Sequence, residues 1–179
     1  MIDHFTLHKW LYRGLLVALT VLDIFIRVLP LGEGRGTFPG PELLLCVVFA
    51  WVLRRPAYAP ALLIAAIFLT TDMLFQNPPG LWPGLVVLGA EFLRVREPLS
   101  RDLPFAIEWG MVAGVMVIML LAERMILGVF MVEQASFGLS ALQLVMTVAI
   151  YPMVVFLSTF ALGVHKLQPG EADAMGNHV

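Results

Sequence analysis

The residues that could do chemistry in this chain are few, and the histidines lie near its two ends. His4 and His8 stand four positions apart, while His165 and His178 follow the last long apolar run. No carboxylate or cysteine pattern completes a metal site around them, and neither a His-Glu-x-x-His nor a Cys-x-x-Cys motif occurs. Serines inside the apolar runs have no histidine nearby to act as a base. We therefore predict no catalytic residue, no metal and no cofactor, and a protein that is not an enzyme.

Charged side chains inside the apolar runs are the other candidates, because a charge near a bilayer centre costs about 2.5–3.5 kcal/mol on insertion scales. Asp23 and Arg27 stand four residues apart, so they share one helical face and can pair. We interpret them as a self-neutralising pair; the alternative is a polar contact with another span or with a partner protein. Glu123 and Arg124 are adjacent and point about 100° apart. We expect Arg124 to reach the outer interface or a carboxylate on another span.

Three further carboxylates lie near the ends of apolar runs. Asp72 and Glu91 fall near opposite ends of neighbouring runs, so we do not expect them to meet. Glu108 lies near the start of the fifth run, where the positive end of the helix dipole favours a negative charge. A capping or interfacial role is therefore expected for Glu108.

Composition identifies the kind of element that must position these residues. Hydrophobic residues make up 60% of the 179 and charged residues 13%, and the mean hydropathy is +0.89, whereas soluble domains carry about 25% charged residues. A soluble domain of this size could not bury so much apolar surface, which predicts a chain immersed in lipid. The net charge of −2 predicts no binding to nucleic acid. The single cysteine, Cys46, is expected to be a small buried hydrophobe.

The apolar runs predict an all-α membrane protein, a bundle of six transmembrane helices. A span needs about 20 mostly apolar residues, and the length of the chain suits six of them with short loops. The expected spans are roughly 12–31, 42–53, 58–75, 81–93, 103–132 and 139–164. The second is short, so it either begins inside Pro39-Gly40-Pro41 or does not cross fully. We expect one membrane domain over residues 1–166 and a polar cytoplasmic tail over residues 167–179.

The distribution of lysine and arginine predicts the orientation of these spans. With the N-terminus in the cytoplasm, eight of the eleven basic residues fall in cytoplasmic segments, and Arg35 alone falls in an outer loop. The eight are Lys9, Arg13, Arg54, Arg55, Arg94, Arg96, Arg101 and Lys166. Both termini are therefore expected in the cytoplasm.

A Gly-x-x-x-Gly spacing occurs in the fifth run, at Gly110 and Gly114. This spacing lets two helices approach closely. We interpret it as internal packing against the sixth run, with a dimer contact as the alternative.

Two segments of the chain resemble a known family. Pro41-Glu42-Leu43 followed by Trp51-Val52-Leu53-Arg54-Arg55-Pro56 resembles the Pro-Asp/Glu-Leu…Trp-x-x-Arg-Arg-Pro block of the bacterial rod shape-determining protein MreD family. Thr71-Asp72-Met73-Leu74 through Gly80-Leu81 is similar to that family's Asp-x-Leu-x-x-x-x-x-Gly-Leu turn. The next run then ends in basic residues, as in the family. The resemblance is strongest over residues 41–101, whereas the polar C-terminal tail and Glu123-Arg124 have no counterpart in the family pattern.

The resemblance implies a non-enzymatic protein of the bacterial inner membrane. MreD-like proteins bind MreC, a single-span protein, and work with the RodA glycosyltransferase, its penicillin-binding transpeptidase partner and MreB filaments in lateral wall synthesis. Their fold is similar to the six-span substrate-binding subunit of energy-coupling vitamin transporters. The expected function is therefore a scaffold subunit of the wall-elongation complex that helps maintain rod shape. The alternative is a small-molecule carrier subunit, because likeness of fold does not fix function.

Under the scaffold hypothesis we expect a few polar residues to contact the partner helix and its juxtamembrane segment. The candidates are Asp23, Arg27, Asp72, Asn77, Pro78 and Gly80. The basic inner loops are expected to meet anionic lipid or a cytoplasmic filament, or else to serve topology alone. Their residues are Arg54, Arg55, Arg94 and Arg96.

Overall fold

The structure is a computed structural model that describes residues 4–29, 40–75, 79–100, 104–132, 134 and 136–160. These residues form α-helices and one short 3₁₀ helix, with no β-strand among them. The elements are α1 (His4–Val28), α2 (Leu43–Arg54), η1 (Pro56–Tyr58), α3 (Ala61–Phe75), α4 (Leu81–Ser100), α5 (Phe105–Val129) and α6 (Phe137–Phe160). The predicted all-α class is confirmed for this part of the chain, and each α-helix overlaps one predicted apolar run.

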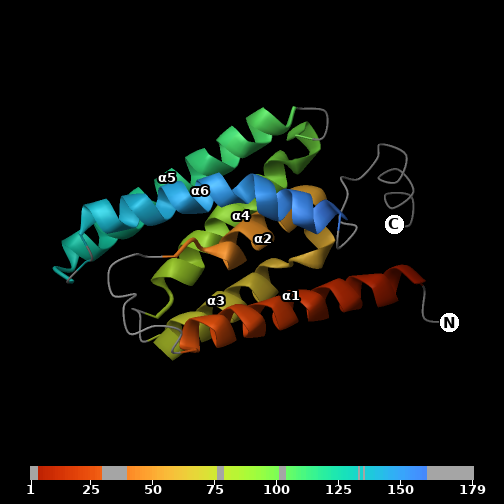
Figure 1. Ribbon diagram of the computed structural model, residues 1–179, viewed down its shortest axis with the longest axis horizontal. Helices are drawn as coiled ribbons and strands as arrows, with labels where there is room; N and C mark the ends of the chain where they lie inside the picture. Colours follow the sequence, from red (N-terminus) through yellow and green to blue (C-terminus); the bar gives the residue numbers. More distant parts are fainter. Residues whose placement is uncertain are drawn as a thin grey trace.

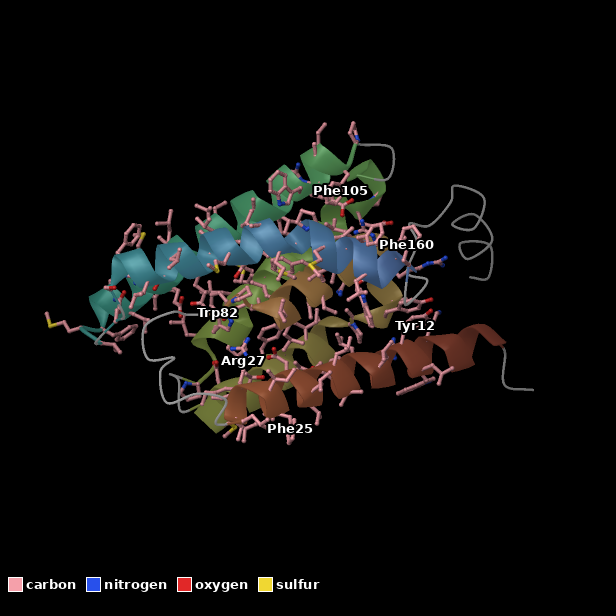
Figure 2. All side chains as sticks on the ribbon, viewed as in Figure 1. Tyr12, Phe25, Arg27, Trp82, Phe105 and Phe160 are labelled. Carbon is pink, nitrogen blue, oxygen red and sulfur yellow. The ribbon has the colours of Figure 1, made fainter. Side chains whose placement is uncertain are left out.

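The helices form a bundle with two distinct ends. α1 and α3 lie along one side, α5 and α6 along the other, and α2 and α4 between them (Figure 1). Tyr12, Phe105 and Phe160 lie toward one end of the bundle, here named the Tyr12 end (Figure 2). Arg27 and Trp82 lie toward the opposite end, named the Arg27 end (Figure 2). α1 begins and α6 ends at the Tyr12 end.

The short second apolar run forms the core of the bundle. α2 packs against α1, α4 and α6, and ten of its twelve residues are buried. A helix rises about 1.5 Å per residue, so α2 extends for only about 18 Å, well below the roughly 30 Å of a bilayer's hydrocarbon core. Its Trp51 ring meets Tyr12 and Tyr58 edge to face, at centroid distances of 6.0 and 6.4 Å. α2 is therefore a short, buried helix enclosed mainly by α1, α4 and α6.

The fourth helix is longer than the apolar run that predicted it. α4 continues past Leu93 to Ser100, through Pro98. Arg94 and Arg96, predicted in a loop, lie instead on the last turns of this helix. Arginine, glutamate and leucine are good helix formers, and an ion pair between Arg94 and Glu91, three residues earlier, supports the same turn. A helix therefore need not end where its apolar run ends.

Much of the outer surface of the bundle is apolar. Within the described residues, two helices, α5 and α6, are long and apolar enough to cross a membrane. In their most apolar segments only 28% and 22% of the residues are buried, whereas the core helix of a soluble protein is mostly buried. The other surface helices also expose large apolar side chains, including Phe25 of α1, Leu62 of α3 and Leu88 of α4. A soluble monomer rarely exposes so much apolar surface.

Gly89 is a position where α4 lies very close to its neighbours. A Cβ atom at this position would lie 2.9 Å from Met119 Sδ, 3.0 Å from Val115 Cγ1 and 3.1 Å from Phe49 Cζ. The valine is stiff at χ1 in a helix, so it cannot easily move aside. The absence of a side chain at Gly89 thus allows α2, α4 and α5 to pack together.

Replacing Gly89 with leucine is expected to destabilise the bundle by about 1–3 kcal/mol, because the new side chain would overpack this contact. Unfolding in detergent can be followed with a thiol-reactive fluorophore, since Cys46 is the one cysteine and is buried. The matched control is Gly84→Leu in the same helix, where a Cβ atom would meet nothing within 4 Å. Equal midpoint temperatures for the two variants would contradict the proposed packing role.

Candidate functional site

A buried ion pair near the Tyr12 end joins three helices. Arg54 Nη1, at the end of α2, lies 2.7 Å from Glu108 Oε1 of α5, and their side chains are 7% and 0% exposed. The Tyr151 hydroxyl of α6 donates to the same carboxylate oxygen at 3.3 Å. The cluster can serve as a structural tie, since removing one partner would leave a buried charge.

This cluster corrects two expectations. Arg54 was predicted on a basic loop that meets lipid or a filament, or else serves topology alone; its guanidinium is buried inside the bundle, which rules out the lipid or filament contact for this residue. Glu108 was predicted in a capping or interfacial role; it lies in the first turn of α5, but it is fully buried and bound to Arg54 and Tyr151, so the interfacial role is wrong. Both residues lie near helix ends, where sequence position alone suggests exposure. The tertiary arrangement instead brings the two helix ends together.

Other arginines at the Tyr12 end bind the connection between α2 and α3. Arg13 of α1 donates from Nε and Nη2 to the Ala57 carbonyl at 3.3 and 3.2 Å. Arg94 of α4 donates to the Ala59 carbonyl in the same connection. Arg96 stands over the Phe92 ring, with its guanidinium carbon 5.1 Å from the centroid. Arg55, the first residue after α2, is half-buried in this connection.

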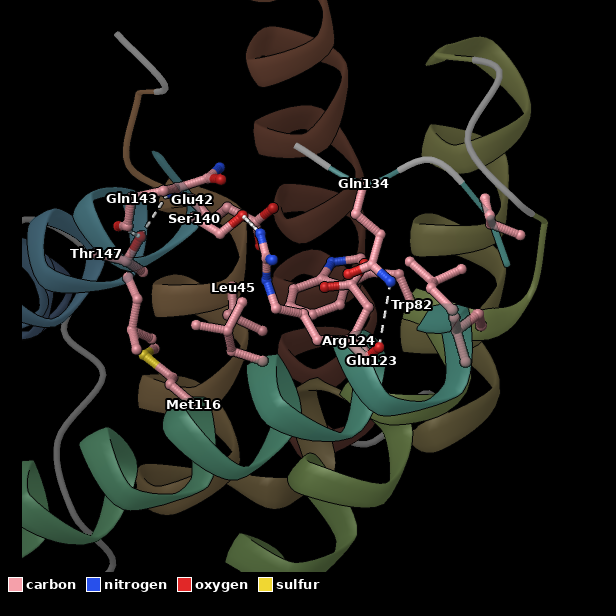
Figure 3. Close-up of a pocket in the computed structure, with 15 residues that line it drawn as sticks. Glu42, Leu45, Trp82, Met116, Glu123, Arg124, Gln134, Ser140, Gln143 and Thr147 are labelled. Atoms are coloured by element: carbon pink, nitrogen blue, oxygen red, sulfur yellow. Dashed lines mark hydrogen bonds between the residues drawn. The ribbon is translucent and has the colours of Figure 1, made fainter. Parts of the chain in front are cut away.

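A cavity of about 400 Å³ lies near the Arg27 end, between α2, α4, α5 and α6. Figure 3 shows its polar side chains converging from these helices and from the segment before α6. Apolar side chains such as Leu45, Met116 and Leu144 form the rest of the wall. The polar and aromatic lining residues are Glu42, Trp82, Glu123, Arg124, Gln134, Ser140, Gln143 and Thr147. This mixture of apolar wall and a few polar groups is typical of small-molecule sites.

Hydrogen bonds position several of these lining groups. Arg124 Nη2 donates to Ser140 Oγ at 2.7 Å, and its guanidinium carbon lies 5.2 Å from the Phe137 ring centroid. The Gln134 amide donates to the Arg124 carbonyl at 3.2 Å. The backbone N–H of Glu42 donates to Thr147 Oγ1 at 3.1 Å. These contacts tie α5 to the start of α6, and α6 to the start of α2.

A second cavity of about 240 Å³ adjoins the first and shares Glu42, Leu45 and Trp82 with it. The other charged side chains of its wall are Asp23, Arg27 and Asp72. The predicted pairing within α1 is confirmed, because Arg27 Nε lies 2.8 Å from Asp23 Oδ2. Together the two cavities form one polar region, here named the polar cavity, lined by carboxylates from α1, α3, α5 and the residue before α2.

The predicted partner contacts are distributed unevenly around this region. Asp23, Arg27 and Asp72 meet at the second cavity, and Asp72 is only 2% exposed. Gly80 precedes α4 with φ +94°, a left-handed conformation that favours glycine in this turn. Asn77 and Pro78 lie outside the described residues. Sequence reasoning missed Glu42 and Gln143 as parts of a site, and the one available signal was a polar side chain beside or within an apolar run.

The Gly-x-x-x-Gly pair was interpreted wrongly. Cβ atoms at Gly110 and Gly114 would meet nothing within 4 Å, so this face of α5 does not pack against α6. α6 contacts α5 elsewhere; Trp109 Nε1, for example, donates to the Val148 carbonyl at 2.9 Å. Val117 and Ile118 continue the exposed face toward the Arg27 end. This surface, named the glycine face, is apolar and uncovered by the described residues.

Across the described part of the chain, no group of three or more histidine, cysteine, aspartate or glutamate residues is placed to hold a metal ion. Comparisons of the whole chain with known proteins also give no assignment. No protein family, no curated protein and no solved structure matches this sequence significantly.

Proposed function

We propose that the protein crosses a bacterial inner membrane several times, with both termini in the cytoplasm. The length and apolar exterior of α5 and α6 support this proposal. The basic residues Arg13, Arg54 and Arg94 all contact groups near the Tyr12 end, where α1 begins and α6 ends. The positive-inside rule assigns such an end to the cytoplasm. The Arg27 end, with the polar cavity, then faces outward.

Within that membrane, we propose a scaffold subunit of the MreD type that binds the transmembrane helix of an MreC-like partner. Through that partner it would work with a RodA-type glycosyltransferase and its penicillin-binding transpeptidase, and indirectly with MreB filaments, in wall elongation. The structural observation that carries the proposal is the glycine face. Small residues let a second helix approach closely inside lipid, where packing drives association. Gly110 and Gly114 offer such an approach, and the described residues leave it open.

Enlarging the glycine face tests the scaffold proposal better than charge reversal at Asp72, which is buried and would perturb the fold. The double variant Gly110→Leu/Gly114→Leu should lower recovery of a co-purified MreC-like partner about tenfold, the change that 1.4 kcal/mol of binding energy produces. Its own fold should persist, because neither new side chain meets another residue at its Cβ atom. Cys46 protection provides the check on folding.

The matched control is Gly14→Leu, at an exposed mid-helix position of α1 where a Cβ atom also meets nothing within 4 Å. It should leave recovery unchanged. Equal recovery from all three proteins would rule out the glycine face as the partner contact. If the wild-type protein brings down an ATPase-containing import complex in place of wall-synthesis proteins, the scaffold proposal is wrong.

A second candidate function, a small-molecule carrier subunit, is favoured by one specific observation. The larger cavity lies within the 300–1,000 Å³ range of small-molecule sites, at about 400 Å³. It also combines apolar walls with convergent polar groups at the end of the bundle proposed to face outward.

A further inference from the structure

We propose that the polar cavity binds an organic cation, an ammonium group carried on a short apolar body. The cavity consists of two adjoining spaces of about 400 and 240 Å³ with a common wall. The inference deepens the carrier candidate and rests on it, but it is independent of the scaffold proposal.

The charge of the lining selects a cation. Four carboxylates contribute to the two spaces, from α1, from the residue before α2, from α3 and from α5, against two guanidinium groups. The formal charge of the lining is therefore −2. The four carboxylates are Asp23, Glu42, Asp72 and Glu123.

Both arginines of the cavity already have interactions within the protein. Arg27 is paired with Asp23 at 2.8 Å. Arg124 donates to Ser140 and stands over the Phe137 ring. An incoming anion would have to compete with these contacts and approach the remaining carboxylates. An incoming ammonium group would be attracted to Glu42 and Glu123 without displacing either arginine.

The aromatic and apolar walls suit the rest of such a ligand. Trp82 belongs to both spaces, so its indole lies where they meet, and the face of a tryptophan ring attracts ammonium groups. Leu45, Met116 and Leu144 supply a contact surface for a hydrocarbon chain. Gln143 and Thr147 add hydrogen-bonding groups on the α6 side (Figure 3). The site thus pairs a carboxylate-rich region with an apolar wall.

The test uses the purified full-length protein in a non-ionic detergent and three probes of equal chain length: n-hexylammonium, n-hexanol and hexanoate. The readout is the unfolding midpoint, followed by the reaction of Cys46 with a thiol-reactive fluorophore. A ligand that binds the folded state raises this midpoint as its concentration exceeds its Kd. We expect hexylammonium to raise the midpoint by a few degrees and the other two probes to have little effect.

The double variant Glu42→Gln/Glu123→Gln should weaken hexylammonium binding at least about tenfold while keeping side-chain size. The matched control, Glu91→Gln, lies in α4 outside the polar cavity, in a partly exposed pair with Arg94, and should bind as the wild type does. An equal response to hexanol, or unchanged binding by the double variant, would overturn the proposal. Because no partner protein is present in this test, a negative result leaves the scaffold proposal standing. If the wild-type protein binds hexylammonium but co-purifies with no MreC-like partner, that result counts against the scaffold proposal alone.

Discussion

Replacing Glu108 with alanine is expected to destabilise the protein by about 3–5 kcal/mol, because it would leave the Arg54 guanidinium buried beside a lost carboxylate. The two groups lie 2.7 Å apart, and neither side chain is more than 7% exposed. The substitution also removes the acceptor of the Tyr151 hydroxyl. In a protein of this length the unfolding midpoint should fall by roughly 10 °C, measured in detergent through the exposure of Cys46.

Two further variants test whether the buried charge, and not the lost side-chain volume, causes this destabilisation. Arg54→Met/Glu108→Leu replaces the pair with apolar groups of similar size and should recover most of the lost stability, because no buried charge remains. Glu91→Ala removes the acidic partner of Arg94 from a pair whose carboxylate is 41% exposed, and should cost at most about 1 kcal/mol. If Glu91→Ala and Glu108→Ala lowered the unfolding midpoint equally, burial of the Arg54–Glu108 pair would not be the cause of the destabilisation by Glu108→Ala.

Local features of the chain predicted the helices well. Proline and glycine segments separate the apolar runs, so the expected third span, 58–75, overlaps α3 (Ala61–Phe75) and ends at the same residue. The expected fifth span, 103–132, likewise brackets α5 (Phe105–Val129). α4 was predicted too short because hydropathy marks where a run meets polar residues, whereas helical hydrogen bonding continues through Arg94 and Arg96.

The site was predictable only where its residues are neighbours in sequence. Asp23 and Arg27 could be paired from their spacing, because four residues bring both onto one face of a single helix. Arg54 and Glu108 are 54 positions apart, and their contact depends on how α2 packs within the bundle. From its place near the start of an apolar run, Glu108 was predicted only to cap the helix or to lie at the interface. Glu42 and Glu123 reach the polar cavity through the same tertiary packing.

The glycine spacing illustrates the same limit. Gly110 and Gly114 lie on one face of a helix, and any sequence analysis can identify that face. Whether it packs inward or remains open depends on the rotation of α5 about its axis. Buried side chains including Val112 and Met116 set that rotation, and they turn the glycines away from the core.

Replacing Trp51 with alanine is the second change with a large expected effect, because Trp51 is the largest fully buried side chain among the described residues. Truncation of a buried tryptophan costs about 3–5 kcal/mol through lost contacts and the cavity it leaves. The cavity would open near the C-terminal end of α2, beside the stacked rings of Tyr12 of α1 and Tyr58 of η1. The unfolding midpoint, again read from Cys46, should fall by roughly 10 °C.

Trp51→Phe should cost clearly less than Trp51→Ala, for a reason specific to this site. The indole Nε1 is buried and has no hydrogen-bond partner among the described residues, so phenylalanine keeps an aromatic ring there without removing a hydrogen bond. The matched control is Trp10→Ala in α1, where the side chain is 64% exposed and its removal opens no internal cavity. If Trp10→Ala lowered the unfolding midpoint as much as Trp51→Ala does, the midpoint would depend on contact with the micelle more than on packing around α2. We expect a midpoint for Trp51→Ala well below that for Trp51→Phe, and little change for Trp10→Ala. This result would identify the buried ring and its contacts with Tyr12 and Tyr58 as a main source of the bundle's stability.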